Sequence, residues 1–418
     1  MWSEAPVTIW AKNVRPLRGG SRTRLISTSR SFERSWSIHM DSSTISNHTF
    51  TDPPIEEAYD VVIVGAGPGG LSAAQAAAHE GAQVLLIDAK RCIGTPVQCG
   101  ELVSQWVSRY VDISANSIQQ KVDRMVTHLP DGSSYEMVGP GFMLDRSIFD
   151  RELAALASRS GATLSIGTRA LTPTADGLVI KKGSQSQRVR AKAIIAADGA
   201  RSTVARWLGL PQPRMILAVQ YEVVLSKPQD HVDIFFDPEY EGGYGWFFPK
   251  GKTANVGVGT VDGGAILLTK RLQAFLNRLL QAQKLTDIAL VGKTGGFIPC
   301  ESRPKTVFEN ILLVGDAAGH AHPITGAGIL HAVIAGQIAG RVAAEAVKAG
   351  NLDHLACYET EWRTFFGETL AYGAQKRVIL ETEWKDPKPN FESLIRRTWV
   401  GFKTYHEQRR GKEAWQTR

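Results

Sequence analysis

The stretch YDVVIVGAGPGG, residues 59–70, decides the fold of this chain. Its apolar first half is typical of a buried β-strand, and it runs directly into Gly65-x-Gly67-x-x-Gly70 and then into an alanine-rich segment typical of a helix. Gly65 makes the tight turn, Gly67 lets the backbone approach a pyrophosphate, and Gly70 lets the helix pack closely on the strand. Free N–H groups at the start of the helix favour phosphate there. The stretch therefore predicts a dinucleotide-binding α/β unit.

Later segments indicate which dinucleotide binds. A second apolar run, Val84–Ile87, ends on Asp88, whose carboxylate can accept hydrogen bonds from a ribose. Residues 191–199 form an apolar run that ends in Asp198-Gly199, and residues 311–316 form another that ends in Asp316. A domain that wraps one long dinucleotide needs such later strands to return to the same sheet edge, where a carboxylate reaches the ribityl hydroxyls. The cofactor predicted by this arrangement is FAD.

Composition limits the other possibilities. With 418 residues, of which 43% are hydrophobic, the chain can bury a large core and is long enough for two intertwined domains. Its four cysteines form no CxxC pair and do not cluster with histidine, so we expect no metal site. No apolar run reaches the roughly 18 residues that a membrane-spanning helix needs.

The net charge of +7 is placed mainly at the two ends. Residues 1–50 carry seven Lys/Arg against three acids, and residues 396–418 carry seven against two, so the middle of the chain is close to −2. We therefore expect no nucleic-acid partner.

Residues 1–55 are predicted to be a disordered or non-native extension, and a true start at Met40 is favoured over an organelle transit peptide. We expect a cytoplasmic protein that can associate with a membrane surface.

Two further motifs narrow the chemistry. Residues 96–101 read PVQCGE, and residues 244–249 read YGWFFP, followed after seven residues by Gly257-Val-Gly259. Together they resemble the geranylgeranyl reductase family of flavoproteins, over roughly residues 58–345. The resemblance implies reduction of C=C bonds in the polyprenyl chains of a lipid, a chlorophyll precursor or a quinone. The electron donor stays open between NAD(P)H and a ferredoxin, because the sequence has no second GxGxxG.

The resemblance also implies where the cofactor is held. The expected contacts come from the glycine loop, the PVQCGE loop and the ends of later strands: Gly65, Gly67, Gly69, Gly70, Asp88, Cys99, Gly100, Leu102, Arg146, Ala170, Asp198, Asp316, Gly328 and Ile329. Arg146 precedes a helix expected over residues 147–160 and can reach the diphosphate or the adenine. Ala170 closes a strand expected over Thr163–Ala170. His320 and His322 are expected to be surface or flavin-shell residues.

Hydride transfer to an unactivated alkene needs a dry apolar tunnel and a proton source. Tyr244, Trp246 and Phe248 are expected to wall that tunnel, and Gly257 is expected to let the chain pass close to the sheet. Cys99 should lie against the isoalloxazine ring and donate the proton, with Tyr244 as the second candidate. A disulfide between Cys99 and Cys300 stays open.

The architecture expected is a mixed α/β flavoprotein, with an FAD-binding Rossmann-type domain interrupted by an antiparallel β-sheet. Residues 56–211 and 295–345 would build the FAD domain, 212–294 the substrate-binding sheet, and 346–418 a set of amphipathic helices that close the tunnel and touch a membrane. Two alternatives remain, an aromatic-ring hydroxylase-type FAD monooxygenase and an electron-transfer flavoprotein that reduces quinone. The oligomeric state is not indicated.

Overall fold

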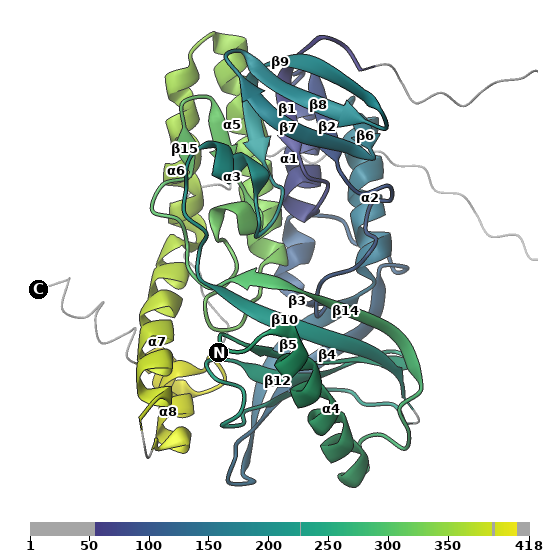
Figure 1. Cartoon of the computed structure of the whole chain (residues 1–418), viewed down its shortest axis with the longest axis vertical. Coiled ribbons are helices and arrows are strands. Elements are labelled where there is room, and N and C mark those ends of the chain that lie inside the picture. The colour runs from purple at the N-terminus through teal and green to yellow at the C-terminus, as the bar shows by residue number, and fades with distance from the viewer. Residues whose placement is uncertain (1–54, 226, 387–388, 408–418) are drawn as a thin grey trace, which may run out of the picture. The chain divides into compact units, whose positions relative to one another are not determined.

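The computed structural model describes residues 55–225, 227–386 and 389–407. The predicted extension over residues 1–55 therefore lies outside the described residues, apart from Ile55, and so does the end of the basic tail from residue 408 onward. Within the described ranges the strands form two eight-stranded sheets (Figure 1).

The first sheet is largely parallel and is built around the opening stretch. Its central path runs β15-β16-β9-β1-β2-β6, and the β7–β8 hairpin joins it at β9. Residues of β1 and β2 are almost all buried, as expected for parallel strands covered on both faces. Its strands are β1 (Ala58–Val64), β2 (Val84–Asp88), β6 (Thr163–Ile166), β7 (Thr168–Thr174), β8 (Gly177–Lys182), β9 (Gln185–Ala196), β15 (Val307–Phe308) and β16 (Ile311–Leu313).

The register of this sheet brings four separate segments to one edge. Val64 at the end of β1 pairs with Ile87 of β2 on one side and with Ala196 of β9 on the other. Leu313 at the end of β16 pairs with Ala196 as well. Since these strands are parallel, the residues that follow them meet at the same carboxyl edge, which is where open α/β sheets bind ligands.

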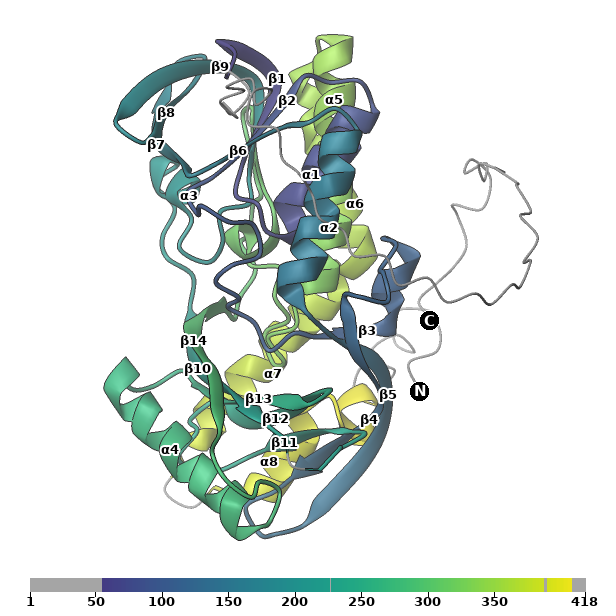
Figure 2. The same cartoon turned by 90° about the vertical axis from the view of Figure 1, so that its right-hand side faces the viewer.

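Helices cover one face of the first sheet (Figure 2): α1 (Pro68–His79), α2 (Arg146–Arg159) and α5 (Ile329–Ala349). The close contact between α1 and α5 depends on glycine. A β-carbon at Gly336 would collide with the carbonyl oxygen of Gly69, and one at Gly340 would collide with that of Ala73. The other face packs against the β7–β8 hairpin and the short helix α3 (Thr203–Trp207).

The second sheet is antiparallel except where β11 pairs with β4. Its order is β14-β10-β13-β12-β11-β4-β5-β3. The strands are β3 (Leu102–Ser104), β4 (Ile118–His128), β5 (Ser134–Leu144), β10 (Met215–Val224), β11 (Val232–Phe235), β12 (Tyr244–Lys250), β13 (Thr253–Thr260) and β14 (Leu290–Pro299).

Two sequence-based expectations need correction here. Residues 102–144 were assigned to the FAD domain, but β3, β4 and β5 belong to the second sheet, because a strand's own pattern does not specify which sheet it joins. The strand expected over Thr163–Ala170 is broken at Gly167, whose φ of +64° turns the chain. Ala170 therefore lies inside β7 rather than at a strand end.

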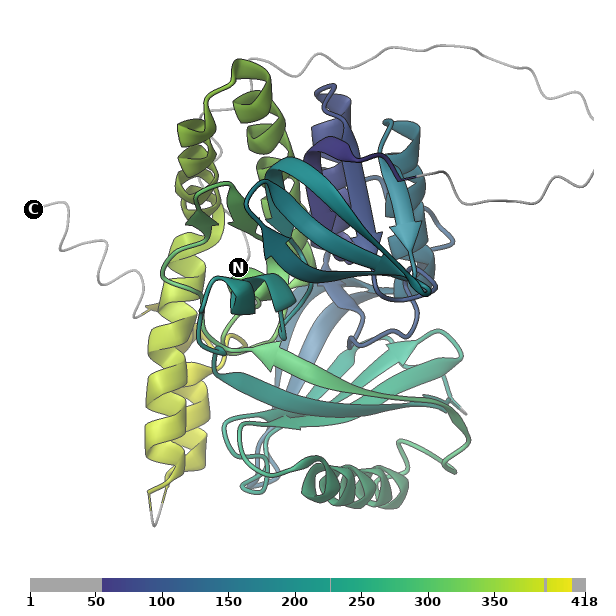
Figure 3. The ribbon, with the colours of Figure 1, turned by 45° about the horizontal axis from the view of Figure 1, so that its top comes forward.

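Alternation along β12 separates the two faces of the second sheet. Phe247 points to one face and packs with the apolar side of α4 (Ala265–Gln281), which lies beside the sheet in Figure 3. Trp246 and Phe248 point to the other face, into an aromatic cluster shared with the C-terminal helices. The helices that share this cluster are α7 (Glu368–Trp384) and α8 (Phe391–Thr398). They are preceded by α6 (Ala356–Trp362) and a π-helical turn at residues 363–367, which pack with the core of the first sheet.

The fold class expected from the sequence is confirmed: a mixed α/β protein with a Rossmann-type sheet, a second antiparallel sheet and C-terminal helices. In the described part of the chain, no helix combines the length and the apolar character needed to cross a membrane.

Candidate active site

The glycine loop after β1 packs tightly against the protein at Gly65 and Gly70 and is open at Gly67. A β-carbon at Gly65, where φ is +109°, would collide with the carbonyl oxygen of Ala197, and one at Gly70 would collide with that of Gly65. Among the described residues, no heavy atom lies within 4 Å of a β-carbon placed on Gly67. Helix α1 begins at the next residue, so its first N–H groups lie beside this open position. An arrangement of this kind could hold a pyrophosphate.

Three carboxylates gather at the edge where the glycine loop lies. The Oδ2 atom of Asp88 accepts a hydrogen bond from Ala66 N at 2.7 Å, so this side chain braces the glycine loop. Asp198 accepts from Thr203 N at 2.6 Å with Oδ2, while its buried Oδ1 has no partner among the described residues. Burial raises the pKa of Asp316 to about 6, against the opposing charge of Arg146.

These features fit FAD. The buried Oδ1 of Asp198, which has no protein donor, needs a donor from elsewhere, and ribose and ribityl hydroxyls are such donors. Gly328 caps α5 beside Asp316, since a β-carbon there would lie 3.5 Å from Asp316 Oδ1, and Ile329 is the first residue of α5. The glycine loop, the carboxylates and the start of α5 could therefore hold the pyrophosphate and the sugar chain of one cofactor.

Three other expected cofactor residues contact the protein itself. Gly69 lies in the α1–α5 contact, where a β-carbon would come 2.9 Å from Val314. Ala170 is buried in the core between the first sheet and its hairpin. Leu102 begins β3 and packs against the aromatic cluster of the second sheet. Their assignment to the cofactor stays a prediction.

Cys99 lies at the junction of the two sheets. Its Sγ accepts a hydrogen bond from Glu101 N at 3.2 Å, and burial raises the pKa of the thiol, so the neutral form persists. The guanidinium of Arg146 lies nearby and opposes this shift. Arg146 itself is held by Asp150 at 2.9 Å through an i,i+4 ion pair within α2. Its side chain thus lies near both Cys99 and Asp316, and its expected reach to the diphosphate or the adenine stays a prediction.

All four cysteines of the described chain are free thiols, so Cys99 and Cys300 form no disulfide in this structure. Cys300 is buried, and burial raises its thiol pKa.

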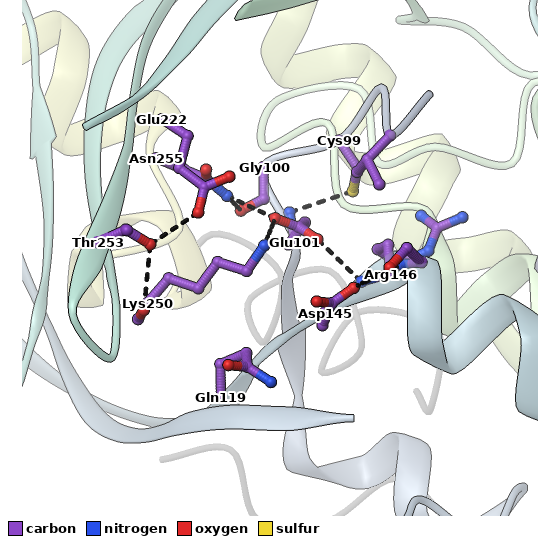
Figure 4. A network of polar contacts seen from close by, with 12 residues as sticks. Cys99, Gly100, Glu101, Gln119, Asp145, Arg146, Glu222, Lys250, Thr253 and Asn255 are labelled. Carbon is purple, nitrogen blue, oxygen red and sulfur yellow. Dashed lines mark hydrogen bonds and ion pairs between the residues drawn. The ribbon is translucent and has the colours of Figure 1, made fainter. Parts of the chain in front are cut away.

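A buried carboxylate that sequence reasoning left without a role anchors the Cys99 loop (Figure 4). Glu101 has a φ of +66°, and its Oε1 accepts from Arg146 N at 2.8 Å. Its Oε2 accepts from Lys250 Nζ at 2.6 Å and from Asn255 Nδ2 at 2.9 Å. One side chain therefore joins the loop to α2, β12 and β13. The sequence feature that could have indicated this role is Asn255, a polar residue among the small and apolar residues in the middle of β13.

The residues expected to wall the substrate tunnel, Tyr244, Trp246 and Phe248, lie on one face of the second sheet, and their contact with substrate stays a prediction. Trp246 donates from Nε1 to Gln220 Oε1 at 2.9 Å, and Gln220 donates from Nε2 to the carbonyl oxygen of Cys99 at 3.1 Å. Tyr244 donates to Thr325 O at 2.6 Å, and burial raises the pKa of its hydroxyl. Phe248 lies against the loop, since a β-carbon at Gly100 would be 3.3 Å from its ring.

Gly257 has a different role from the one expected. A β-carbon at this position would overlap the indole of Trp246, so the glycine makes room for that ring rather than for a passing chain. The remaining cavity beside the ring is about 20 Å³, room for one water. It is lined by Ile216, Ala218, Gly243, Tyr244, Trp246, Gly259, Ile298 and Gly326. Sites for drug-sized ligands run to roughly 300–1,000 Å³, so a hydrocarbon chain could occupy this place only if aromatic side chains moved.

The two histidines after Asp316 are not on the surface. His320 is fully buried, with its ring centroid 4.6 Å from that of Trp362, and His322 accepts from Thr325 N at 3.3 Å. Burial lowers the pKa of His322 to about 3. The helices that cover this turn are remote in sequence, and the local pattern gave no sign of them. No group of potential metal ligands occurs in the described ranges.

Two family matches agree with this geometry. Residues 60–205 match the FAD dependent oxidoreductase family, and residues 215–297 match the geranylgeranyl reductase catalytic domain. The second match covers most of the second sheet from β10 to β14. It includes the strands that carry Gln220, Trp246 and Asn255.

Two relatives from other organisms support the same family assignment. A digeranylgeranylglycerophospholipid reductase of Methanothrix thermoacetophila is 37% identical over 339 residues, covering 75% of this chain and 85% of the relative. The enzyme of the same name from Methanosphaerula palustris is 35% identical over 329 residues, covering 73% of this chain and 82% of the relative.

Solved structures show the same fold. A geranylgeranyl bacteriochlorophyll reductase-like protein from Thermoplasma acidophilum matches with a TM-score of 0.73 at 28% identity, covering 84% of this chain and 98% of that one. A flavin-dependent brominase matches with a TM-score of 0.64 at 17% identity, over 86% of this chain and 99% of that one, which shows a shared fold alone. The chain therefore belongs to the geranylgeranyl reductase family of FAD-dependent oxidoreductases.

Proposed function

We propose that this chain uses FAD to saturate C=C bonds in the polyprenyl chains of a membrane lipid. The observation that carries the proposal is the direct connection between Cys99 and the aromatic wall. A neutral, half-buried thiol and an apolar surface lie on either side of one glutamine, Gln220. Relatives named digeranylgeranylglycerophospholipid reductase support a geranylgeranyl lipid as the substrate class.

Bound FAD, when reduced, supplies the hydride that saturating an alkene requires. The chain's own residues have three tasks. The aromatic face around Tyr244 and Trp246 excludes water and binds the hydrocarbon. Cys99 holds a proton at Sγ, because burial raises its pKa, and gives that proton to the second alkene carbon. Glu101 fixes the loop that carries the thiol.

The proposal is tested by anaerobic reoxidation of the reduced holoenzyme. A geranylgeranyl lipid in detergent should restore the absorbance of oxidised flavin and yield product that is two hydrogens heavier per saturated bond. Quinone alone, or oxygen with a phenol, should not give turnover at a comparable rate. Reoxidation only by quinone would identify an electron-transfer flavoprotein, and coupled hydroxylation of the phenol would identify a monooxygenase.

We also propose that the C-terminal end contacts an anionic membrane surface, where such a lipid is found. Residues 396–418 carry seven Lys/Arg against two acids. The first part of this segment also builds the fold, since Trp399, Phe402 and Tyr405 are buried in the aromatic cluster. A test of membrane contact must therefore change charges beyond residue 407 and leave these aromatic residues in place.

A further inference from the structure

We propose that Gln220 is a positioning residue that couples the place of the Trp246 indole to the place of the Cys99 thiol. The inference deepens the proposed function and rests on it. Gln220 lies on β10, next to β13 in the second sheet, and its side chain is 6% exposed. It is a polar residue in the run MILAVQYEVV, where apolar residues dominate.

The side chain of Gln220 uses both ends of its amide. Its Nε2 donates to the carbonyl oxygen of Cys99 at 3.1 Å, and its Oε1 accepts from Trp246 Nε1 at 2.9 Å. An amide buried in this way loses free energy if either bond is broken, because water does not replace the lost partner. The two contacts therefore depend on each other.

Several hydrogen bonds hold the Cys99 loop, at Val97, Gln98 and Gly100 as well as at Glu101 and Cys99, and the bonds at the last two residues differ in strength. At Glu101 a buried charge accepts from Lys250 Nζ, Asn255 Nδ2 and Arg146 N, and charge-assisted hydrogen bonds of this kind are the stronger class. At Cys99 the carbonyl is held by the neutral amide of Gln220. The loop is thus fixed at Glu101 and at the neighbours of Cys99, while the Cys99 carbonyl itself is held by the amide that also bonds the indole.

Entry of a polyprenyl chain disturbs the bond at the Cys99 carbonyl. The indole fills the space above Gly257, and the cavity beside it is about 20 Å³. A chain that lies against this face must displace the ring, which removes the donor from Gln220 Oε1. Gln220 then reorients, and its hold on the Cys99 carbonyl changes. The position of the thiol therefore differs between the empty and the chain-bound states.

The test is the rate at which iodoacetamide alkylates Cys99 in the FAD-loaded protein, with and without geranylgeraniol in detergent. A Cys92→Ser background removes an exposed thiol seven residues away in the chain, and peptide mass spectrometry identifies the modified residue. In this background we expect geranylgeraniol to change the alkylation rate at least threefold. Gln220→Met and Trp246→Phe should each abolish that change, because one removes the amide and the other removes the indole donor while keeping an aromatic ring.

Gln98→Met is the matched control. Gln98 lies in the same loop and donates to Gly295 O at 2.8 Å, but it has no bond to Trp246. This variant should keep the dependence on geranylgeraniol. Retention of the full dependence in both Gln220→Met and Trp246→Phe, or no dependence before substitution, would overturn the inference. If Gln220→Met does not retain FAD, Trp246→Phe alone decides.

Kinetics separate this inference from the proposed function. Gln220→Met should lower kcat for alkene-dependent reoxidation at least tenfold, and adding Trp246→Phe should lower it little further, because both act on one linkage. Absence of alkene-dependent reoxidation in the unaltered protein would reject the proposed function. Reoxidation at the unaltered rate in Gln220→Met would reject only the role of Gln220.

Discussion

Replacing Asp316 by Asn should stabilise the flavin-free protein and at the same time weaken its hold on FAD. Burial raises the pKa of Asp316 from 3.8 to about 6. A shift of roughly two pH units, at about 1.4 kcal/mol per unit, means that the ionised side chain destabilises the flavin-free fold by about 3 kcal/mol near neutral pH. Asparagine has nearly the same shape and no charge, so most of that free energy should be recovered.

The sign of the pH dependence follows from the same shift. The folded protein binds a proton at Asp316 up to about pH 6, while the unfolded chain releases it near pH 3.8. The folded state thus binds more protons in this window, and its stability falls as pH rises from about 4 to 6. The unfolding free energy of the flavin-free Asp316→Asn variant should lack this component, and at pH 7.5 it should exceed that of the unaltered protein by about 2–3 kcal/mol.

Two measurements check this prediction: urea unfolding of the flavin-free protein from pH 4.5 to 8, and titration with FAD. Loss of a charge-assisted acceptor, worth about 1.5–3 kcal/mol, should weaken FAD binding by roughly 10- to 100-fold. Asp88→Asn is the control, because Asp88 already accepts from Ala66 N and Lys90 N, and its loss should destabilise the fold. A flavin-free Asp316→Asn protein that is less stable than the original at pH 7.5 would refute the reasoning.

Three further predictions concern Glu101, Cys99 and the basic C-terminal end of the chain. Glu101→Gln leaves Lys250 buried without its anionic partner, so it should lower the unfolding free energy measured in urea by about 3–5 kcal/mol. Adding Lys250→Met should restore most of this loss. A Glu101→Gln variant that is as stable as the original protein would contradict the prediction. Because burial raises the pKa of Cys99, alkene-dependent reoxidation should decline only above the ordinary thiol pKa of about 8.5, and a decline below pH 8 would count against the thiol as donor. Changing Arg409, Arg410 and Lys412 to Gln should weaken sedimentation with anionic vesicles at low salt, and undiminished binding would reject the membrane contact.

The sequence predicts the first sheet's binding edge well because the requirements there are local. Gly65 and Gly70 permit contacts that any β-carbon would prevent, and Asp88 braces the loop. These constraints act over a few residues or across adjacent parallel strands, so they leave a readable motif. The motifs around Cys99 and Trp246 are likewise visible, although their spacing says nothing about the distance between them.

The features of the fold and of the site that the sequence did not reveal depend on contacts between segments that are remote in the chain. The sequence did not reveal that β4 joins β11, or that C-terminal helices bury His320. Gly257 was read as an opening for substrate, but its neighbour across the strand pair, Trp246, occupies that space. Gln220 is a polar residue in a strand where apolar residues dominate. Its role is apparent only from the structure, in which its amide bonds both the Cys99 carbonyl and the Trp246 indole.

Under the proposed function, Cys99 supplies the proton when a polyprenyl double bond is reduced. This role is tested most directly by stopped-flow anaerobic reoxidation of the reduced holoenzyme by a geranylgeranyl lipid, in the unaltered protein and in Cys99→Ser. The variant should retain FAD and still accept electrons from dithionite, while alkene-dependent reoxidation slows by roughly 10²- to 10⁴-fold. Reoxidation of Cys99→Ser at the unaltered rate would contradict the claim and leave the thiol a packing residue, with Tyr244 the next proton donor to test.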